Sequence, residues 1–306
     1  EVSIVKKDTN TQTCLSGAVY GIYSDPECKN LIVKMPATDK NGASKVSFVK
    51  TQETVYLKEI TAPRGYLVET KAENIKLEAA GKTVTVTDKE QKANILIYKQ
   101  GEVLTGALTT DTGVTFQYEK RKQPGAVFEV TAAADIVRAD GTTVYKKGEV
   151  IKSGLKTDAS GSVSLKNLYL GSYKITETKA PANLICKGES KEITLSYAGQ
   201  TVETVVEEMT FTNDRQKANV TVVKKDIDTE KPLAGGVYAL YAGNDIKNVD
   251  GSVIVKKGTL IEKATTGADG SALYQADLPI GNSYDVKEDK APNLYVRNTT
   301  DVFTFH

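Results

Sequence analysis

The chain has 306 residues, enough for two or three domains, and carries 40 Lys and Arg against 39 Asp and Glu. This balance gives no indication of a nucleic-acid or anionic-membrane partner, and no apolar run is long enough for a transmembrane helix, so no direct membrane insertion is expected. The only histidine, His306, is the last residue, which argues against charge-relay hydrolases and His-ligated metal sites. No signal peptide is present, and because the chain begins with Glu1 rather than Met, we expect a piece of a longer protein.

The first third of the chain predicts strands in short alternating runs. These runs are rich in Val, Thr, Ile and Tyr and are broken by Gly, Asn, Asp and Pro. Helical periodicity is not sustained anywhere, so an all-β protein built from sandwiches is expected. The predicted strands cover residues 2–8, 16–24, 45–50 and 82–90.

An internal repeat divides the chain into three units. QKANILIYK (residues 91–99) matches QKANVTVVK (residues 216–224), and both resemble the opening VSIVK. Each is followed by a second predicted strand: SGAVYGIY, PGAVFEV or AGGVYALY. We therefore predict tandem domains at 1–91, 92–216 and 217–306.

The later units carry additional segments. Units two and three share an inserted hairpin (residues 139–151 and 249–261), and unit two has a further insertion at 101–122. The Asp-containing turns TDKNG and TDASG lack the spaced oxygen ligands and final glutamate of a calcium loop. They are interpreted as hairpin turns, and no metal or cofactor is expected.

Each unit has a glutamate strand that runs into an Ala-Pro turn, at residues 55–63, 173–181 and 284–292. Side chains alternate faces along a strand, so Glu59, Glu177 and Glu288 share a face with apolar neighbours. A lone buried carboxylate is costly, so each glutamate needs a partner.

The same alternation supplies those partners. Lys6, Lys99 and Lys224 fall on the apolar face of the first strand of their units, while Asp88 and Asn213 do so on the closing strands of units one and two. Buried ion pairs barely offset their desolvation, so a recurring pair favours a chemical role over a purely stabilising one.

Burial itself suggests that role. It lowers the pKa of a lysine and raises that of a carboxyl group, which leaves a nucleophilic neutral amine beside a protonated glutamate. The amine can attack the side-chain carbonyl of Asp or Asn while the glutamate polarises it and transfers protons. The product is an isopeptide bond between the first and last strands, with loss of water or ammonia.

The motifs Lys-x-Asp, Leu-x-Gly-Ala and Tyr-x-x-x-Glu-x-x-Ala-Pro occur in order along the chain. Examples are KKD, LSGAVY, YKITETKAP and APRGY. Together they resemble the collagen-adhesin B-type (CnaB-like, SpaA-type pilin-related) domains of Gram-positive surface proteins. The resemblance implies tandem prealbumin-like, inverse immunoglobulin-type sandwiches with spontaneous isopeptide bonds.

Carried over by position, the resemblance implies a triad of Lys6, Glu59 and Asp88 and a second of Lys99, Glu177 and Asn213, with the glutamates as catalytic proton shuttles. Unit two departs from the motifs at QGEVLTG after its lysine and at APANL, and unit three has APNLY. These departures affect the turns and leave the triad positions intact.

Unit three is predicted to lack its last strand. TDVFTFH (residues 300–306) aligns with KEITLS, the penultimate strand of unit two. We therefore expect Lys224 and Glu288 to have no acceptor within this chain. The unit would expose a strand-shaped gap, for which truncation and donor-strand exchange are both open explanations.

The three cysteines are too few for a disulfide scaffold. Cys14 and Cys28 flank the second strand of unit one, whose length separates its ends by roughly 15–20 Å. A disulfide between them requires the following loop to fold back, and it stays an open alternative. Cys186 has no evident partner.

The expected function is a structural stalk or shaft segment of a Gram-positive adhesin or pilin, extracellular and anchored to the cell wall. Its partners would be neighbouring domains of the same surface protein. Cross-linking is a single self-modification, so no turnover enzyme is expected; a glycosidase would need paired carboxylates in a cleft. The alternative is an adhesin module that binds host matrix protein or glycan through the unit-two insertions.

Overall fold

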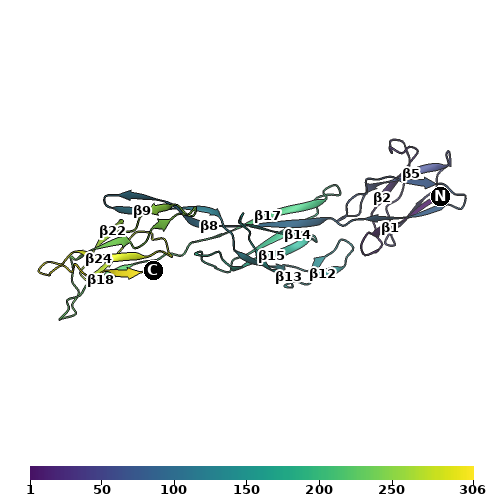
Figure 1. The fold of residues 1–306 in the computed structure, drawn as a ribbon. Helices are drawn as coiled ribbons and strands as arrows, with labels where there is room; N and C mark the ends of the chain where they lie inside the picture. Colours follow the sequence, from purple (N-terminus) through teal and green to yellow (C-terminus); the bar gives the residue numbers. More distant parts are fainter.

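A computed structural model describes residues 1–306 as three β-sandwiches in a line (Figure 1). The N-terminus lies in the sandwich at one end of the elongated molecule and the C-terminus in the sandwich at the other. We call them unit 1, unit 2 and unit 3, with the bounds given above. The chain forms strands throughout, and no helix long and apolar enough to cross a membrane is present.

Unit 1 packs a three-stranded sheet, in the order β4-β1-β7, on a four-stranded sheet, in the order β3-β2-β5-β6. β1 and β7, the first and last strands, run parallel, and the other neighbours are antiparallel. The strands are β1 (Val2–Asp8), β2 (Val19–Tyr23), β3 (Leu31–Lys34), β4 (Ala43–Val46), β5 (Thr54–Thr61), β6 (Glu73–Lys76) and β7 (Lys82–Asp88).

The alternation predicted for unit 1 is observed. Every second residue of β1 is buried, beginning with Val2 and including Lys6. One strand is shifted from its expected position: residues 45–50 were predicted as a strand, but β4 ends at Val46. Val46 pairs with Val2, the first residue of β1, so residues beyond it have no partner strand to bond.

Unit 2 repeats this arrangement with insertions. Its sheets have the orders β14-β8-β17 and β13-β10-β15-β16, with β8 parallel to β17. The strands are β8 (Lys92–Thr110), β9 (Gly113–Lys122), β10 (Val127–Ala132), β13 (Val150–Lys156), β14 (Ser162–Leu168), β15 (Gly171–Lys179), β16 (Ser190–Leu195) and β17 (Thr204–Asn213), and the inserted hairpin is β11 (Ile136–Val137) with β12 (Thr143–Tyr145).

Unit 3 has a complete four-stranded sheet, in the order β22-β19-β24-β25, but its second sheet contains only β18 and β23. No strand pairs with the outer edge of β18, where β7 and β17 lie in the other units. The strands are β18 (Thr221–Val223), β19 (Val237–Ala242), β22 (Leu260–Thr265), β23 (Ser271–Leu273), β24 (Tyr284–Lys290) and β25 (Phe303–Phe305), and the inserted hairpin is β20 (Ile246–Lys247) with β21 (Val253–Val255).

The insertion at 101–122 leaves unit 2. The second half of β8 and the whole of β9 form a hairpin that reaches onto unit 3 (Figure 1). Val114 and Phe116 of β9 are buried in the same apolar cluster as Tyr238 and Ile261 of unit 3. The approach is close, since a Cβ added at Gly113 would collide with the carbonyl oxygen of Ile261. Residues assigned by sequence to unit 2 therefore complete the core of unit 3.

Candidate cross-linking sites

The unit 1 site lies between the two sheets. Lys6 on β1 pairs with Val86 of β7, so Asp88, two residues further on, projects from the same face beside it. Lys6 Nζ donates a hydrogen bond to Asp88 Oδ1 and lies 2.9 Å from Glu59 Oε1, and all three side chains are fully buried. The structure thus brings together the three residues that the repeat pattern singled out.

Two further hydrogen bonds reach the Lys6–Glu59 pair, one from the facing sheet and one from the loop after β5. Glu59 on β5 pairs across the ladder with Tyr20 on β2, whose hydroxyl oxygen accepts a hydrogen bond from Lys6 Nζ at 2.6 Å. The other carboxylate oxygen of Glu59 accepts a hydrogen bond from the backbone N–H of Glu69 at 2.8 Å. Tyr20 was not predicted from the sequence. Its position in SGAVYGIY, repeated as Tyr238 in AGGVYALY, was the signal available.

Burial controls the protonation of this site. Desolvation, only partly offset by the positive charge of Lys6, raises the pKa of Asp88 to about 7. Asp88 Oδ2 has no hydrogen-bond partner. Burial and the neighbouring carboxylates also raise the pKa of Tyr20, so its hydroxyl stays protonated. Asp88 can therefore carry a proton near neutral pH, and a protonated carboxyl group is the form that can lose water.

Unit 2 repeats the geometry with an amide acceptor. Lys99 on β8 pairs with Phe211, which again places the acceptor, Asn213, two residues further along the parallel strand. Lys99 Nζ lies 3.0 Å from Glu177 Oε1, and Asn213 Nδ2 donates a hydrogen bond to Glu177 Oε2 at 2.7 Å. Both the lysine and the glutamate side chains are fully buried.

The amine of unit 2 has fewer partners than that of unit 1. Although Lys99 Nζ is close to Glu177, the angle is not that of a hydrogen bond, and Nζ has no hydrogen-bond partner. Phe128 occupies the position of Tyr20, opposite Glu177, and packs on Phe211 with ring centroids 4.9 Å apart. Burial lowers the pKa of Lys99, which favours the neutral amine.

Unit 3 holds two members of the set without an acceptor. Lys224 Nζ lies 3.2 Å from Glu288 Oε1, which also accepts a hydrogen bond from the Tyr238 hydroxyl at 3.2 Å. The second oxygen of Glu288 accepts from the backbone N–H of Asn298 at 2.7 Å, as Glu59 does from Glu69. The Lys224 side chain is 23 % exposed, whereas those of Lys6 and Lys99 are 0 % exposed.

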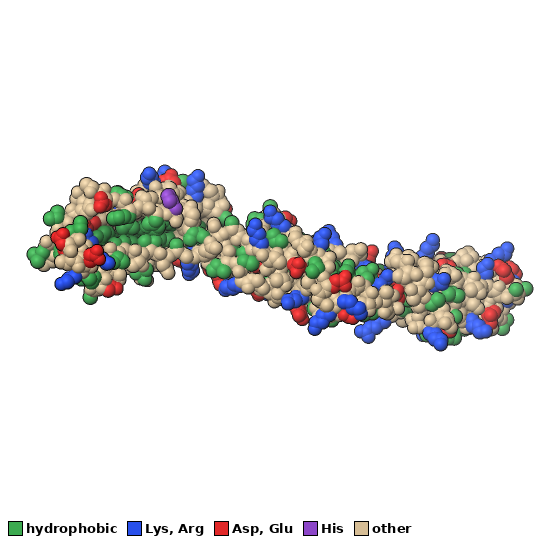
Figure 2. Space-filling model, turned by 90° about the horizontal axis from the view of Figure 1, so that it is seen from below, with side chains coloured by type: hydrophobic (Ala, Val, Ile, Leu, Met, Phe, Trp, Pro, Cys, Tyr) green, Lys and Arg blue, Asp and Glu red, His purple; other side chains and the backbone are tan.

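An opening lined by both apolar and charged side chains lies beside Lys224. It has a volume of about 270 Å³ and includes Val222, Tyr238 and Phe303 in its lining. Figure 2 shows a hollow with hydrophobic side chains on this unit, close to the single histidine. Burial of Lys224 acts to lower its pKa, but its interactions with Glu288 and Tyr238 outweigh this and raise it. Lys224 therefore stays protonated, in the form that is not nucleophilic.

The three cysteines are free. Cys14 forms an isolated bridge to Lys7 after β1, whereas Cys28 lies in the turn after β2. The disulfide that the sequence left open between Cys14 and Cys28 is absent from the structure, in which both residues are free cysteines. Cys186 is exposed, and its thiol contacts the backbone oxygen of Glu177 at 3.8 Å.

The junction between units 1 and 2 uses the first inserted hairpin. Arg138, which follows β11, lies 3.3 Å from Asp8 and 3.4 Å from Glu90, the residues at the end of unit 1. The backbone N–H of Ala139 donates to Glu90 Oε1 at 2.8 Å, and the Tyr66 hydroxyl donates to Asp8 at 2.9 Å. These contacts hold the β11–β12 hairpin of unit 2 against the end of unit 1 that carries its Ala-Pro turn.

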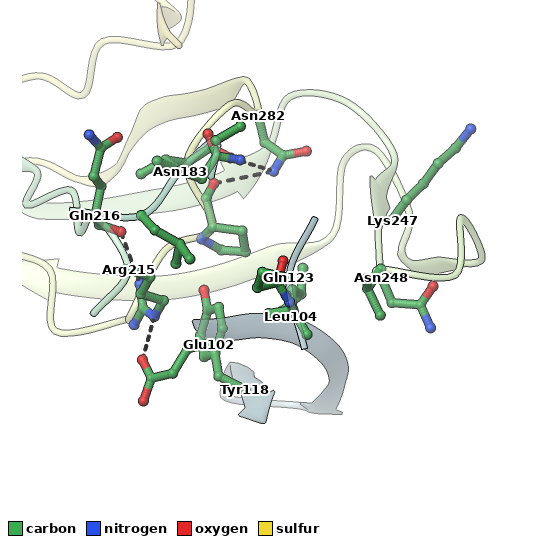
Figure 3. Close-up of a pocket in the computed structure, with 16 residues that line it drawn as sticks. Glu102, Leu104, Tyr118, Gln123, Asn183, Arg215, Gln216, Lys247, Asn248 and Asn282 are labelled. Carbon is green, nitrogen blue, oxygen red and sulfur yellow. Dashed lines mark hydrogen bonds and ion pairs between the residues drawn. The ribbon is translucent and has the colours of Figure 1, made fainter. Parts of the chain in front are cut away.

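The junction between units 2 and 3 contains a small pocket of about 270 Å³ (Figure 3). Arg215 in its wall pairs with Glu102 at 3.5 Å and with Asp277, and lies over the ring of Tyr118 at 3.8 Å. The backbone N–H of Val249 donates to Leu104 O at 2.9 Å. The insertions considered as adhesive surfaces are therefore engaged in contacts between neighbouring units.

Fold and sites define a class of protein: a tandem array of β-sandwiches with a lysine and a glutamate placed between the sheets of each one. A family model described as a SpaA prealbumin-like fold domain matches residues 1–92, 112–210 and 218–306. The chain therefore belongs to the SpaA prealbumin-like domain family, as its motifs indicated.

Two individual proteins are similar to parts of this chain or to its fold. The trypsin-resistant surface T6 protein of Streptococcus pyogenes serotype M6 is 28% identical over 131 residues, which cover 40% of this chain and 23% of that protein. The solved structure of the Bacillus anthracis TIE protein aligns with a TM-score of 0.62 and 20% identity over 99% of this chain and 47% of that one. The chain thus spans about a quarter of the first protein and half of the second.

Proposed function

We propose that this chain is a load-bearing stalk or shaft segment of a Gram-positive surface protein, in which units 1 and 2 are each closed by an isopeptide bond. The observation that carries the proposal is the Lys6 amine, fully buried and in contact with both Asp88 and Glu59. The bonds join Lys6 to Asp88 and Lys99 to Asn213. The streptococcal relative is described as a trypsin-resistant surface protein, which supports a location at the cell surface.

The proposed chemistry balances without a cofactor. The Lys6 amine attacks the Asp88 carboxyl carbon, Glu59 takes a proton from the nitrogen and returns one to the departing hydroxyl, and water leaves. In unit 2 the same exchange between Lys99 and Asn213 releases ammonia. Each bond forms once, so the units modify themselves and do not turn over a substrate.

The positions of the two bonds determine the path of a tensile load. Lys6 and Asp88 lie near the ends of two parallel neighbouring strands, so force entering β1 passes through the bond to Asp88, the last residue of β7, and on to β8. The second bond transfers it from β8 to β17. Residues 7–87 and 100–212 lie outside this covalent path. Each cross-link also restricts the unfolded chain, which stabilises its unit by about 4 kcal/mol in chain-entropy terms.

Single-molecule stretching of the whole chain between its ends tests this function. We expect one unfolding event, from unit 3, with no release of the chain length held in residues 7–87 or 100–212. Glu59→Gln and Glu177→Gln should each add one event of the matching length. Release of either segment in the unmodified protein would refute the load-bearing role.

A further inference from the structure

The residue that pairs with the glutamate on the neighbouring strand is not the same in all three units. The lysine, glutamate and acceptor of units 1 and 2 do not account for this difference. Tyr20 in unit 1 and Tyr238 in unit 3 stand opposite Glu59 and Glu288, whereas unit 2 has Phe128 opposite Glu177. Only one hydroxyl group distinguishes the side chains. In unit 1 that hydroxyl contacts the reacting amine itself, since Lys6 Nζ donates to it at 2.6 Å.

A neutral amine has two N–H donors and one lone pair, and only the lone pair can attack. In unit 1 one N–H is directed to the Tyr20 oxygen, which lies on the facing sheet, away from β7. This contact restricts rotation about the terminal C–N bond of Lys6. It leaves the remaining positions on nitrogen to Asp88 and Glu59, with which Nζ is also in contact.

Unit 2 offers its amine no such restraint. Lys99 Nζ has no hydrogen-bond partner, and a phenylalanine ring at position 128 has no oxygen to accept one. Glu177 is instead engaged with the amide of Asn213, which fixes the acceptor rather than the nucleophile. The two sites therefore orient different reactants, although their lysine, glutamate and strand register correspond.

Resting on the cross-linking proposed above, we infer that Tyr20 is a positioning residue that holds the Lys6 amine for attack on Asp88, and that its absence at Phe128 makes unit 2 the slower site. Tyr20 takes no part in the bonds made and broken: the N–C bond forms, the C–OH bond breaks, and Glu59 carries the proton. Correct orientation of a reacting group accelerates a reaction, because even a small misplacement of the reacting atoms slows the attack.

The test follows both bonds in one molecule. The full chain is made by cell-free translation, quenched at intervals in acidic denaturant, digested, and assayed for the Lys6–Asp88 and Lys99–Asn213 cross-linked peptides by mass spectrometry. Tyr20→Phe should slow the first bond about tenfold, the effect of losing one buried hydrogen bond to the reacting group, and leave the second unchanged. Phe128→Tyr should accelerate the second bond.

Tyr173→Phe is the matched control. It removes another buried tyrosine hydroxyl, one that donates to the backbone oxygen of Tyr169 at 2.6 Å, and it should alter neither rate. The rate of the second bond within Tyr20→Phe reports whether the array folds normally. A structural defect confined to unit 1 would appear in the circular-dichroism melting curve of the Tyr20→Phe chain. Loss of positioning alone would leave that curve unchanged and slow only the Lys6–Asp88 bond.

The outcomes separate this inference from the function on which it rests. If neither cross-linked peptide forms in the unmodified chain, the cross-linking function fails and this inference fails with it. If both cross-linked peptides form and the Lys6–Asp88 bond forms equally fast in Tyr20→Phe and in the unmodified chain, only the role of Tyr20 is overturned. An unchanged rate in Phe128→Tyr would overturn the claim that this hydroxyl sets the difference between the units.

Discussion

Units 1 and 3 carry the same lysine, glutamate and tyrosine at corresponding positions, yet their surroundings differ. In unit 1, β7 covers Lys6 and supplies Asp88, whose pKa burial raises to about 7. In unit 3 nothing pairs with the outer edge of β18, and the Glu288 contacts raise the pKa of Lys224 despite its partial burial. In unit 1 the closing strand therefore supplies Asp88 and completes the burial of Lys6, whereas Lys224, without such a strand beside it, stays 23 % exposed.

The cores of the two units differ as well. The apolar cluster of unit 1 is built from residues of β1 to β7 and their adjoining loops, whereas that of unit 3 includes Val114 and Phe116 from the β8–β9 hairpin. Unit 1 is thus closed by its own last strand and unit 3 is supported by a segment of its neighbour.

The largest expected effect comes from Glu59→Gln. It keeps the shape of the side chain but removes the proton carrier, so we expect the Lys6–Asp88 bond to be lost and unit 1 to unfold with about 4 kcal/mol less free energy. Intact mass would show that the variant retains one water that the unmodified chain loses, and calorimetry would show the destabilisation. Glu53→Gln, an exposed site in the same unit, should have neither effect. A cross-link that survives Glu59→Gln would show that unit 1 does not depend on this carboxyl group.

A smaller effect is expected from Phe116→Ala. It removes a large apolar side chain from the core of unit 3, so unit 3 should lose about 3 kcal/mol of unfolding free energy while units 1 and 2 keep theirs. The measurement is limited proteolysis across a temperature series, with cleavage sites assigned to each unit. Thr115→Ala, exposed on the other face of β9, is the control. If unit 3 is cleaved no faster in Phe116→Ala, the hairpin does not support it.

The smallest expected effect is a pH dependence that distinguishes the two closed sites. Because burial raises the pKa of Asp88 to about 7, this carboxyl group is protonated below that pH and becomes a carboxylate above it. A carboxylate does not lose hydroxide readily, so the rate of the Lys6–Asp88 bond should fall, relative to that of the Lys99–Asn213 bond, as the pH rises above 7. Asn213 is an amide that does not ionise in this pH range, so the rate of the Lys99–Asn213 bond should show no corresponding decrease. The ratio of the two rates across pH 6 to 9, from the peptide assay described above, measures this, and a ratio independent of pH would contradict it.

Much of the site could be predicted from the sequence because it depends on strand alternation. The faces of Lys6, Glu59 and Asp88 follow from the alternation of side chains along each strand, and the link between first and last strands follows from the proposed chemistry and the resemblance to CnaB-like domains. The course of the β8–β9 hairpin could not be predicted in this way. Alternation in Val114 and Phe116 indicates an apolar face but not which unit covers it, because that depends on the length and twist of β8. Tyr20 was missed because a tyrosine on an apolar face is usually explained by packing.

The most direct test of the account is the intact mass of the reduced, denatured chain at high resolution. The account predicts a deficit of one water and one ammonia, with peptide mapping that places the bonds at Lys6–Asp88 and Lys99–Asn213 and finds Lys224 unmodified. An unshifted mass would contradict the cross-linking of units 1 and 2. A bond at Lys224 within the isolated chain would contradict the contrast between the closed and open units.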